Sequence, residues 1–580
     1  MGLRICLVTP FDWSQPHDVN EHVAGAAQAL RARGHEVTVL AASTRAADLL
    51  AGRRALLDGR GADGGVIALG AAVPVSRRSR MGVPVGVRAN LSLALARGRF
   101  DVVHGFEPAL PSLSYLALRE TEALAVATFF SPERLAYPPS RAQRERLLGR
   151  IDALLATSER TAEAAAARFP GDFRVVTAGV DTTLFHPARK RTLIVAELRQ
   201  TSRPIVRALM RELRTLEGWE LMLLRTRPLV ARPAIPRVLV GRVHVRTLRS
   251  GASRAELLNE AAVFVPAPLG LARVSLEAAA AGCAIAAPPG VEGQPELASA
   301  AAARLVEDEA LRGRRGAEAR ADAERESFEQ LGAELDRIYT GLAKRRRSPR
   351  RREADPLADR PWLVADLHMH TSHSHDCSIE PAELVAHAEE QGLGAIAVTD
   401  HNSFGGALAA VEAAKRRHLT VIPGEEVKTD VDGEVIGLFL RQEIPRGMPF
   451  ADTIAAIREQ GGLVYVPHPF DRMHSIPSPA TLARHLADID VLEVYNARLL
   501  FEGYNDEALR FARKYNLTMG AGSDAHVLQG VGTGALRMRA FRDPEEFLIS
   551  LRTAEVLRRP KSLAYLQSLK WVAQVKEKVR

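Results

Sequence analysis

The feature that most constrains the fold is an alternation of short β-branched runs with helical stretches rich in Ala, Leu and Arg along the 580-residue chain. Residues 4–9, 20–33 and 36–41 show the pattern near the start. The order strand, helix, strand predicts a parallel sheet with helices on both faces. Because the pattern restarts after Pro187, we expect two doubly wound Rossmann-like halves, at residues 1–186 and 187–343.

Two basic segments lie outside this alternation. Residues 344–360 lack apolar periodicity and begin with KRRRSPRRR, so we expect a solvated basic linker. In residues 556–580 apolar side chains recur at helical spacing, which predicts a basic amphipathic tail that docks on the preceding domain or contacts a membrane surface.

The net charge of +9 comes from basic residues in and next to these two segments. Residues 344–352 hold seven cations, and residues 552–580 add a net charge of +6, so the remainder is slightly acidic. The expected folded bodies therefore do not resemble a basic nucleic-acid-binding surface. Any contact with a polyanion is expected at the linker or the tail.

The sequence also indicates the cellular compartment. Its three cysteines lie far apart and form no CxxC pair, which favours a reducing compartment and predicts a cytoplasmic location. The sequence contains no apolar run of the roughly 18 residues that a membrane-spanning helix needs, so no transmembrane segment is expected.

A third domain is expected at residues 361–555, because 11 of the 17 histidines follow residue 360. Seven strand-like runs occur there, mostly separated by helical stretches, and polar residues gather at their carboxyl ends. This arrangement predicts a barrel of the TIM type. The expected strands cover residues 364–368, 395–399, 420–423, 434–440, 463–466, 491–495 and 518–521.

The polar residues at these strand ends indicate a metal centre. His368 and His370 stand two apart on one strand and therefore point the same way. A mixed set of imidazoles and carboxylates suits Zn²⁺, Mn²⁺ or Fe²⁺, and it exceeds what one ion can use, so two or three ions are expected. The converging residues are Asp366, His368, His370, Asp376, Asp400, His401, Glu426, Glu434, His468, Asn496, Asp524 and His526.

Five motifs of this domain resemble, in order, those of the PHP (polymerase and histidinol phosphatase) family. The motifs are DLHMHTSHSHD at 366–376, TDHN at 399–402, GEEV at 424–427, PHPFDR at 467–472 and SDAH at 523–526. The resemblance implies a distorted seven-stranded β/α barrel. It also implies a metal-dependent phosphatase, phosphodiesterase or polymerase-associated exonuclease.

The resemblance further implies which residues hold metal. One ion would be held by His368, His370, Glu426 and Asp524, with Glu426 bridging to a second ion that His468 also holds. A third ion would be held by Asp376, His401 and His526. Many family members have a histidine at the position of Glu434, so we expect an altered metal preference or a weaker second site there.

Hydrolysis of a phosphate ester follows as the expected reaction. Paired ions supply hydroxide near neutral pH and neutralise charge on phosphoryl oxygens. Glu426, Asp524, Arg472 and Arg498 are the expected catalytic residues. Arg472, Arg498, Lys428 and Asn496 stand beside the ligand motifs and are expected to bind a small phosphorylated substrate.

The first 343 residues resemble retaining glycosyltransferases of family 4, which have the GT-B fold. The resemblance lies in LRICLVTPF at 3–11, NEHVAGAAQALRARGHEVTVL at 20–40, GVDTTLFHP at 179–187 and ARVSLEAAAAGCAIAAPP at 272–289. It implies a nucleotide-sugar donor whose diphosphate is bound at a helix N-terminus.

The donor site departs from the family pattern. His17 and Asp18 replace the usual Gly-Gly pair, and Glu197 replaces an arginine. Arg199, Arg203 and Glu277 remain as candidates for the donor site. We therefore expect a degenerate or sugar-binding module. The alternatives are an active transferase whose product the third domain processes, and a polyanion-binding protein that uses the basic linker.

Overall fold

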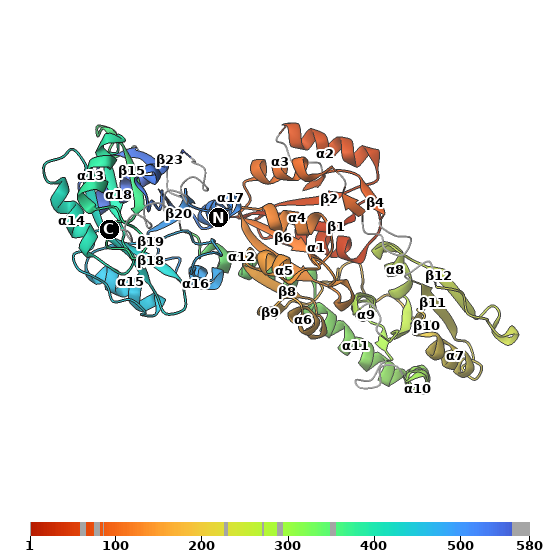
Figure 1. The fold of residues 1–580 in the computed structure, drawn as a ribbon. Helices are drawn as coiled ribbons and strands as arrows, with labels where there is room; N and C mark the ends of the chain where they lie inside the picture. Colours follow the sequence, from red (N-terminus) through yellow and green to blue (C-terminus); the bar gives the residue numbers. More distant parts are fainter. Residues whose placement is uncertain are drawn as a thin grey trace. The chain divides into compact units, whose positions relative to one another are not determined.

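The computed structural model divides into two compact units, Met1–Ala343 and Lys344–Arg580 (Figure 1). The tail expected at residues 556–580 lies almost entirely outside the described residues. No helix in the described ranges is long and apolar enough to cross a membrane. The structure describes residues 2–58, 65–74, 82–84, 86–225, 230–268, 272–286, 294–347 and 355–559.

The first unit opens with a seven-stranded, fully parallel sheet in the order β3-β2-β1-β6-β7-β8-β9. Its strands β1 and β6 are buried almost throughout, as expected for a sheet covered on both faces. The strands are β1 (Arg4–Asp12), β2 (Glu36–Ala42), β3 (Val66–Ala68), β6 (Val102–Phe106), β7 (Leu124–Phe129), β8 (Ala153–Ala156) and β9 (Phe173–Val175). The helices are α1 (Asp18–Ala32), α2 (Ala46–Asp58), α3 (Arg88–Gly98), α4 (Leu113–Glu120), α5 (Arg141–Leu148) and α6 (Glu159–Ala166), and β4 (Ala72–Pro74) pairs with β5 (Gly82–Pro84).

A second parallel sheet of the same unit has the order β12-β11-β10-β13-β14. Its last helix, α12, returns to pack on α1, where a Cβ at Gly332 would lie only 2.7 Å from the Cβ of Ala29. The strands are β10 (Arg191–Glu197), β11 (Glu220–Arg225), β12 (Val243–Thr247), β13 (Ala261–Val265) and β14 (Ala284–Ile285). The helices are α7 (Arg203–Glu212), α8 (Gly251–Leu258), α9 (Ala272–Ala280), α10 (Pro295–Glu307), α11 (Glu309–Arg325) and α12 (Phe328–Ala343).

The second unit is built around seven strands, β15 to β21, that neighbour one another in chain order. β18 is antiparallel to both of its neighbours, which distorts an otherwise parallel barrel. Asp524 N donates to His368 O at 2.8 Å, so the chain after β21 returns to β15 and brings the ring close to closure. The strands are β15 (Trp362–Met369), β16 (Ala395–Val398), β17 (Thr420–Lys428), β18 (Glu434–Leu438), β19 (Leu463–Val466), β20 (Val491–Asn496) and β21 (Thr518–Gly522).

Alternate side chains of these strands enter two apolar clusters. In β16, Ala397 packs in a cluster with Tyr465 and Phe547, whereas Val398 packs with helix residues such as Leu384. Successive side chains of a strand point to opposite faces of the sheet, so a strand that is buried on both faces places alternate apolar residues in each cluster. The helices are α13 (Pro381–Glu390), α14 (Gly405–Ala414), α15 (Phe450–Glu459), α16 (Pro479–Arg484), α17 (Glu502–Tyr515) and α18 (Pro544–Leu551).

These features confirm the predicted α/β class and the distorted seven-stranded barrel. Two strands that the sequence analysis did not expect extend the sheet: β22 (Gly534–Arg539) pairs antiparallel with β15, and β23 (Glu555–Arg558) pairs with β22. The second unit therefore continues to the first residues of the segment that we expected to be tail.

The described ends of the expected linker are anchored at a few side chains, while Lys344, Arg345, Pro356, Ala358 and Asp359 are exposed. Arg347 N donates to Tyr515 O at 3.1 Å, and the Arg347 guanidinium donates to Leu486 O at 3.0 Å. At the other end Leu357 is buried and Arg360 forms an ion pair with Glu546 at 2.8 Å. The sequence did not predict the anchoring of Arg347, Leu357 and Arg360, because single anchoring side chains leave no periodicity in the sequence.

Asp366 joins β15 to the chain after β21. Its fully buried carboxylate accepts hydrogen bonds from the backbone N–H groups of Ser523 and Gly532, both at 2.9 Å. Burial raises the pKa of Asp366 to about 6, and the hydrogen bonds oppose this rise. Asp366 therefore holds the segment that carries Asp524 and His526.

We predict that Asp366→Ala lowers the free energy of unfolding of the second unit by about 3 kcal/mol, because two backbone N–H groups are left buried and unpaired. Urea denaturation with hydrogen exchange across residues 523–534 measures the effect. Asp359→Ala removes an exposed carboxylate and is the control. Equal unfolding midpoints for the two variants would contradict the role given to Asp366.

Candidate metal centre

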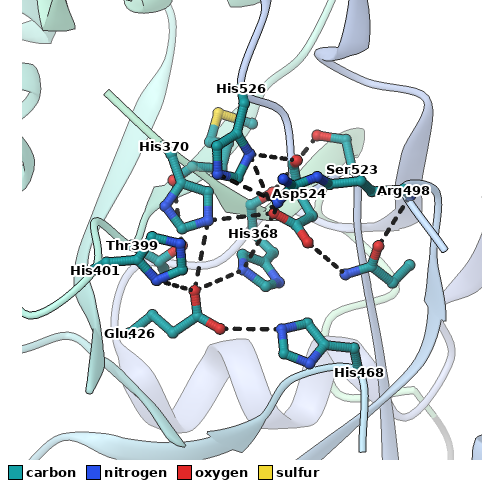
Figure 2. Close-up of polar contacts among 12 residues, drawn as sticks. His368, His370, Thr399, His401, Glu426, His468, Arg498, Ser523, Asp524 and His526 are labelled. Carbon is teal, nitrogen blue, oxygen red and sulfur yellow. Dashed lines mark hydrogen bonds and ion pairs between the residues drawn. The ribbon is translucent and has the colours of Figure 1, made fainter. Parts of the chain in front are cut away.

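Histidines and carboxylates from separate strands meet at the carboxyl end of the barrel (Figure 2). His368 lies in β15 and His370 directly follows it, Glu426 lies in β17, and His468 follows β19. The parallel strands end at the same edge of the barrel, so their terminal side chains converge. His401 follows β16 and is half-buried, whereas Asp524 and His526, which follow β21, are buried.

The centre of the cluster consists of two imidazoles that face two carboxylates. His368 Nε2 lies 3.4 Å from Glu426 Oε2, and His370 Nε2 lies 3.3 Å from Asp524 Oδ1. Both imidazole nitrogens are buried and form no hydrogen bond. Buried polar atoms without partners are rare in folded proteins, and an imidazole nitrogen beside a carboxylate oxygen is a common ligand pair for a transition metal. These residues therefore fit a metal ion.

Glu426 is shared between several sets of potential ligands. His368, Glu426 and His468 each place one ligand atom within 4.8 Å of the others, and so do His401, Glu426 and Glu434. Further sets within the same distance are His368, His370 and Asp524, and His370, His401 and His526. Sets that overlap in this way are suited to more than one ion.

Glu434 and Asp376 are the partly exposed carboxylates of the cluster. Glu434 Oε2 is 4.0 Å from His468 Nε2, and burial together with the charge of Glu426 raises the pKa of Glu434 to about 7. Asp376 Oδ2 is 3.0 Å from His526 Nε2 and its Oδ1 is 3.8 Å from His401 Nε2. The structure thus brings every expected metal ligand into one region, including the glutamate that replaces the usual histidine.

The two central carboxylates are strongly anionic. Burial opposes ionisation, but His401 and His368 hold the pKa of Glu426 well below its usual range. Arg498 and His368 have the same effect on the pKa of Asp524, again against burial. Ionised carboxylates are the form that binds a cation.

Glu493, in β20, contacts the side of the His368 imidazole that faces away from Glu426. Its role was not predicted from the sequence. Its buried carboxylate accepts hydrogen bonds from Tyr465 Oη at 2.9 Å and from His468 N at 2.7 Å, and it lies 3.2 Å from His368 Nδ1. A carboxylate at Nδ1 fixes the imidazole and leaves Nε2 to face a metal. The signal in the sequence was a lone acidic residue in the apolar strand VLEVYN.

His370 has a similar support. Ser374 Oγ lies 3.1 Å from His370 Nδ1 and donates to Asp400 Oδ1 at 2.7 Å. Asp400 also accepts hydrogen bonds from the backbone and the hydroxyl of Thr371, both at 2.6 Å. Asp400 therefore orders the loop after β15 and is not directed at the cluster.

The expected substrate-binding residues divide into two groups. Arg498 lies at the cluster, 3.2 Å from Asp524 Oδ1, and Asn496 Nδ2 donates to Asp524 Oδ2 at 3.3 Å. Arg472 and Lys428 are exposed side chains, and within the described residues neither forms an ion pair with the cluster. Their contact with substrate stays a prediction.

In the first unit, two of the three candidate donor residues, Glu277 and Arg199, are paired with opposite charges. Buried Glu277 accepts from Arg254 at 2.5 and 2.6 Å and from Arg273 at 2.9 Å, and Glu21 of α1 binds both arginines. Arg199 Nε donates to Glu197 Oε1 at 2.6 Å. Arg203 lies apart from them and reaches Ala231 O at 3.5 Å.

Comparison with known families agrees with both units. Residues 19–184 match Glycosyltransferase Family 4, residues 366–502 match the PHP domain, and residues 502–556 match the PHP-associated region. The first unit therefore contains a Glycosyltransferase Family 4 domain, and the second contains a PHP domain with its PHP-associated region. Both predicted resemblances are confirmed.

Individual relatives cover parts of the chain. An uncharacterized protein of Methanocaldococcus jannaschii is 35% identical over 214 residues, which cover 35% of this chain and 85% of that protein. A phosphatidyl-myo-inositol mannosyltransferase of Propionibacterium freudenreichii is 33% identical over 168 residues, which cover 28% of this chain and 42% of that enzyme. A solved glycosyltransferase of Rickettsia africae is 14% identical, with a TM-score of 0.40, and the match covers 59% of this chain and 98% of that one.

We predict that Glu493→Gln weakens metal binding about 10- to 100-fold, because the amide no longer fixes His368 as a carboxylate does. Competition with a chromophoric chelator measures the affinity, and circular dichroism confirms the fold. Glu390→Gln, on the exposed face of α13, is the matched control. Unchanged affinity in Glu493→Gln would contradict the positioning role.

Proposed function

We propose that the second unit hydrolyses a phosphate ester of a small molecule with the help of two or three divalent ions, Mn²⁺, Zn²⁺ or Fe²⁺. The observation that carries the proposal is the pair of buried imidazole nitrogens without hydrogen bonds that face Glu426 and Asp524. His368, His370, Glu426 and Asp524 would hold one ion. His468 and Glu434 would complete a second site with Glu426, and Asp376, His401 and His526 would form a third.

The chemistry follows from this set. Bound ions would supply hydroxide near neutral pH and neutralise charge on the phosphoryl oxygens. Arg498 stands between Asp524 and Asp376, at 3.2 and 3.8 Å, and its remaining N–H groups can donate to a phosphoryl oxygen. Asn496 orients Asp524, and exposed Arg472 and Lys428 would contact the substrate from outside the cluster.

We predict that Asp524→Asn lowers kcat/KM for phosphate esters at least about 100-fold, because the amide removes an anionic ligand and leaves Arg498 without its partner. A panel of phosphomonoesters and phosphodiesters, assayed with the full chain and added Mn²⁺, measures the rate. Asp506→Asn makes the same chemical change at an exposed position of α17 and should retain the wild-type rate. A wild-type chain that holds metal and hydrolyses none of the panel would rule out the proposal.

For the first unit we propose a glycosyltransferase-like module that does not use a nucleotide-sugar in the usual way. The support is the pairing of Glu277 with Arg254 and Arg273, and of Arg199 with Glu197, which leaves these groups already neutralised. A diphosphate would have to displace a buried ion pair, which is costly. The active-transferase alternative requires that these pairs open for the donor.

Calorimetry with UDP-glucose and GDP-mannose tests this second proposal. We predict no binding heat up to about millimolar ligand, because Arg254, Arg273 and Arg199 are occupied by internal carboxylates. Micromolar binding that is lost in Glu277→Ala would instead support an active transferase whose product the second unit processes.

A further inference from the structure

Three loops at the mouth of the barrel expose large apolar side chains. Val431 is 83% exposed in the loop after β17, Met473 is 70% exposed in the loop after β19, and Phe501 is 54% exposed in the loop after β20, where it follows exposed Leu500. Four of the six exposed large apolar side chains that the second unit shows in its described residues lie on these loops. Such a concentration on one part of a surface marks a binding region.

The apolar side chains lie close in sequence to the metal cluster. Met473 follows His468 by five residues, Val431 follows Glu426 by five, and Phe501 follows Arg498 by three. β17 to β20 are consecutive in the barrel, and the loops that carry these side chains leave it at the edge where the ligands converge. The apolar side chains therefore border the mouth on the side of these four strands.

Two of the loops are held in place by their own contacts. Thr481 Oγ1 donates to Asp432 Oδ1 at 2.8 Å, and Gly433, at φ 85°, packs so closely on the backbone of Ile476 and Pro477 that a Cβ has no room. The exposure of Val431 and Met473 thus belongs to an ordered surface. Exposure of an apolar side chain to water is unfavourable in free energy, and a ligand that covers the side chain removes this cost.

The opposite side of the mouth is polar. The loop after β15 presents Ser372, His373 and His375 to solvent, and the loop after β16 carries partly exposed Asn402. A ligand whose phosphate reaches the metal cluster would therefore meet exposed apolar side chains, interspersed with Lys428 and Arg472, on one side and polar side chains on the other.

We propose that the substrate is a phosphate ester whose alcohol part carries an apolar group, and that this group lies against Val431, Met473 and Phe501 while the phosphate enters between the metal ligands and Arg498. The proposal rests on the hydrolase function proposed above and names its substrate class. Burial of several methylene groups corresponds to at least about a tenfold preference over a polar alcohol of similar size.

The test compares two monoesters, hexyl phosphate and glycerol phosphate, with the full chain and Mn²⁺. We expect wild-type kcat/KM to be at least about tenfold higher for hexyl phosphate, and the double variant Met473→Ser, Phe501→Ser to reduce this ratio below about threefold. Leu408→Ser removes an exposed apolar side chain from α14 and should keep the wild-type ratio. A wild-type ratio near one, or an equal loss for both esters in the double variant, would overturn the proposal.

Binding of hexylphosphonate and methylphosphonate, measured by calorimetry, separates this inference from the hydrolase function. Tighter binding of hexylphosphonate, together with no hydrolysis across the panel of phosphate esters, would support the apolar subsite and contradict the hydrolase. Equal binding of the two phosphonates would overturn the apolar subsite whatever the hydrolysis shows.

Discussion

The second unit depends on one arrangement: a buried carboxylate, Glu426, that imidazoles approach from several strands. His401 Nδ1 lies 3.0 Å, His468 Nε2 3.1 Å and His368 Nε2 3.4 Å from its oxygens. Burial of so many polar groups without a cation would be costly, and the Nε2 atoms of His368 and His370 form no hydrogen bond. The barrel geometry makes the arrangement available, because each parallel strand delivers its last residues to the same edge.

Buried charged and polar side chains have different partners in the two units. In the first unit buried Glu277 is neutralised by Arg254 and Arg273. In the second unit His368 and His370 direct unpartnered nitrogens toward carboxylates. A buried ion pair that is complete resists a new ligand, whereas an incomplete donor set attracts one. This difference is the physical reason for placing the chemistry in the second unit.

Much of the barrel could be predicted from the sequence. Its strands begin or end within a few residues of the expected positions, because β-branched runs and terminal polar residues mark them directly. His368 and His370 were expected to lie on one face because they stand two residues apart at the end of a strand. Glu493 could not be found, since its role depends on Tyr465 and His468, which approach it only in the folded barrel. Arg347 was missed for the same reason, because its carbonyl partners are remote in sequence.

The metal content of the purified full chain, determined by plasma mass spectrometry after removal of loosely bound ions, tests the central claim most directly. The account predicts two or three transition-metal ions per chain, and fewer in a variant with His370→Ala, because His370 belongs to two of the overlapping ligand sets. A metal content well below one ion per chain, in protein that is folded and was supplied with Mn²⁺, Zn²⁺ and Fe²⁺, would contradict it.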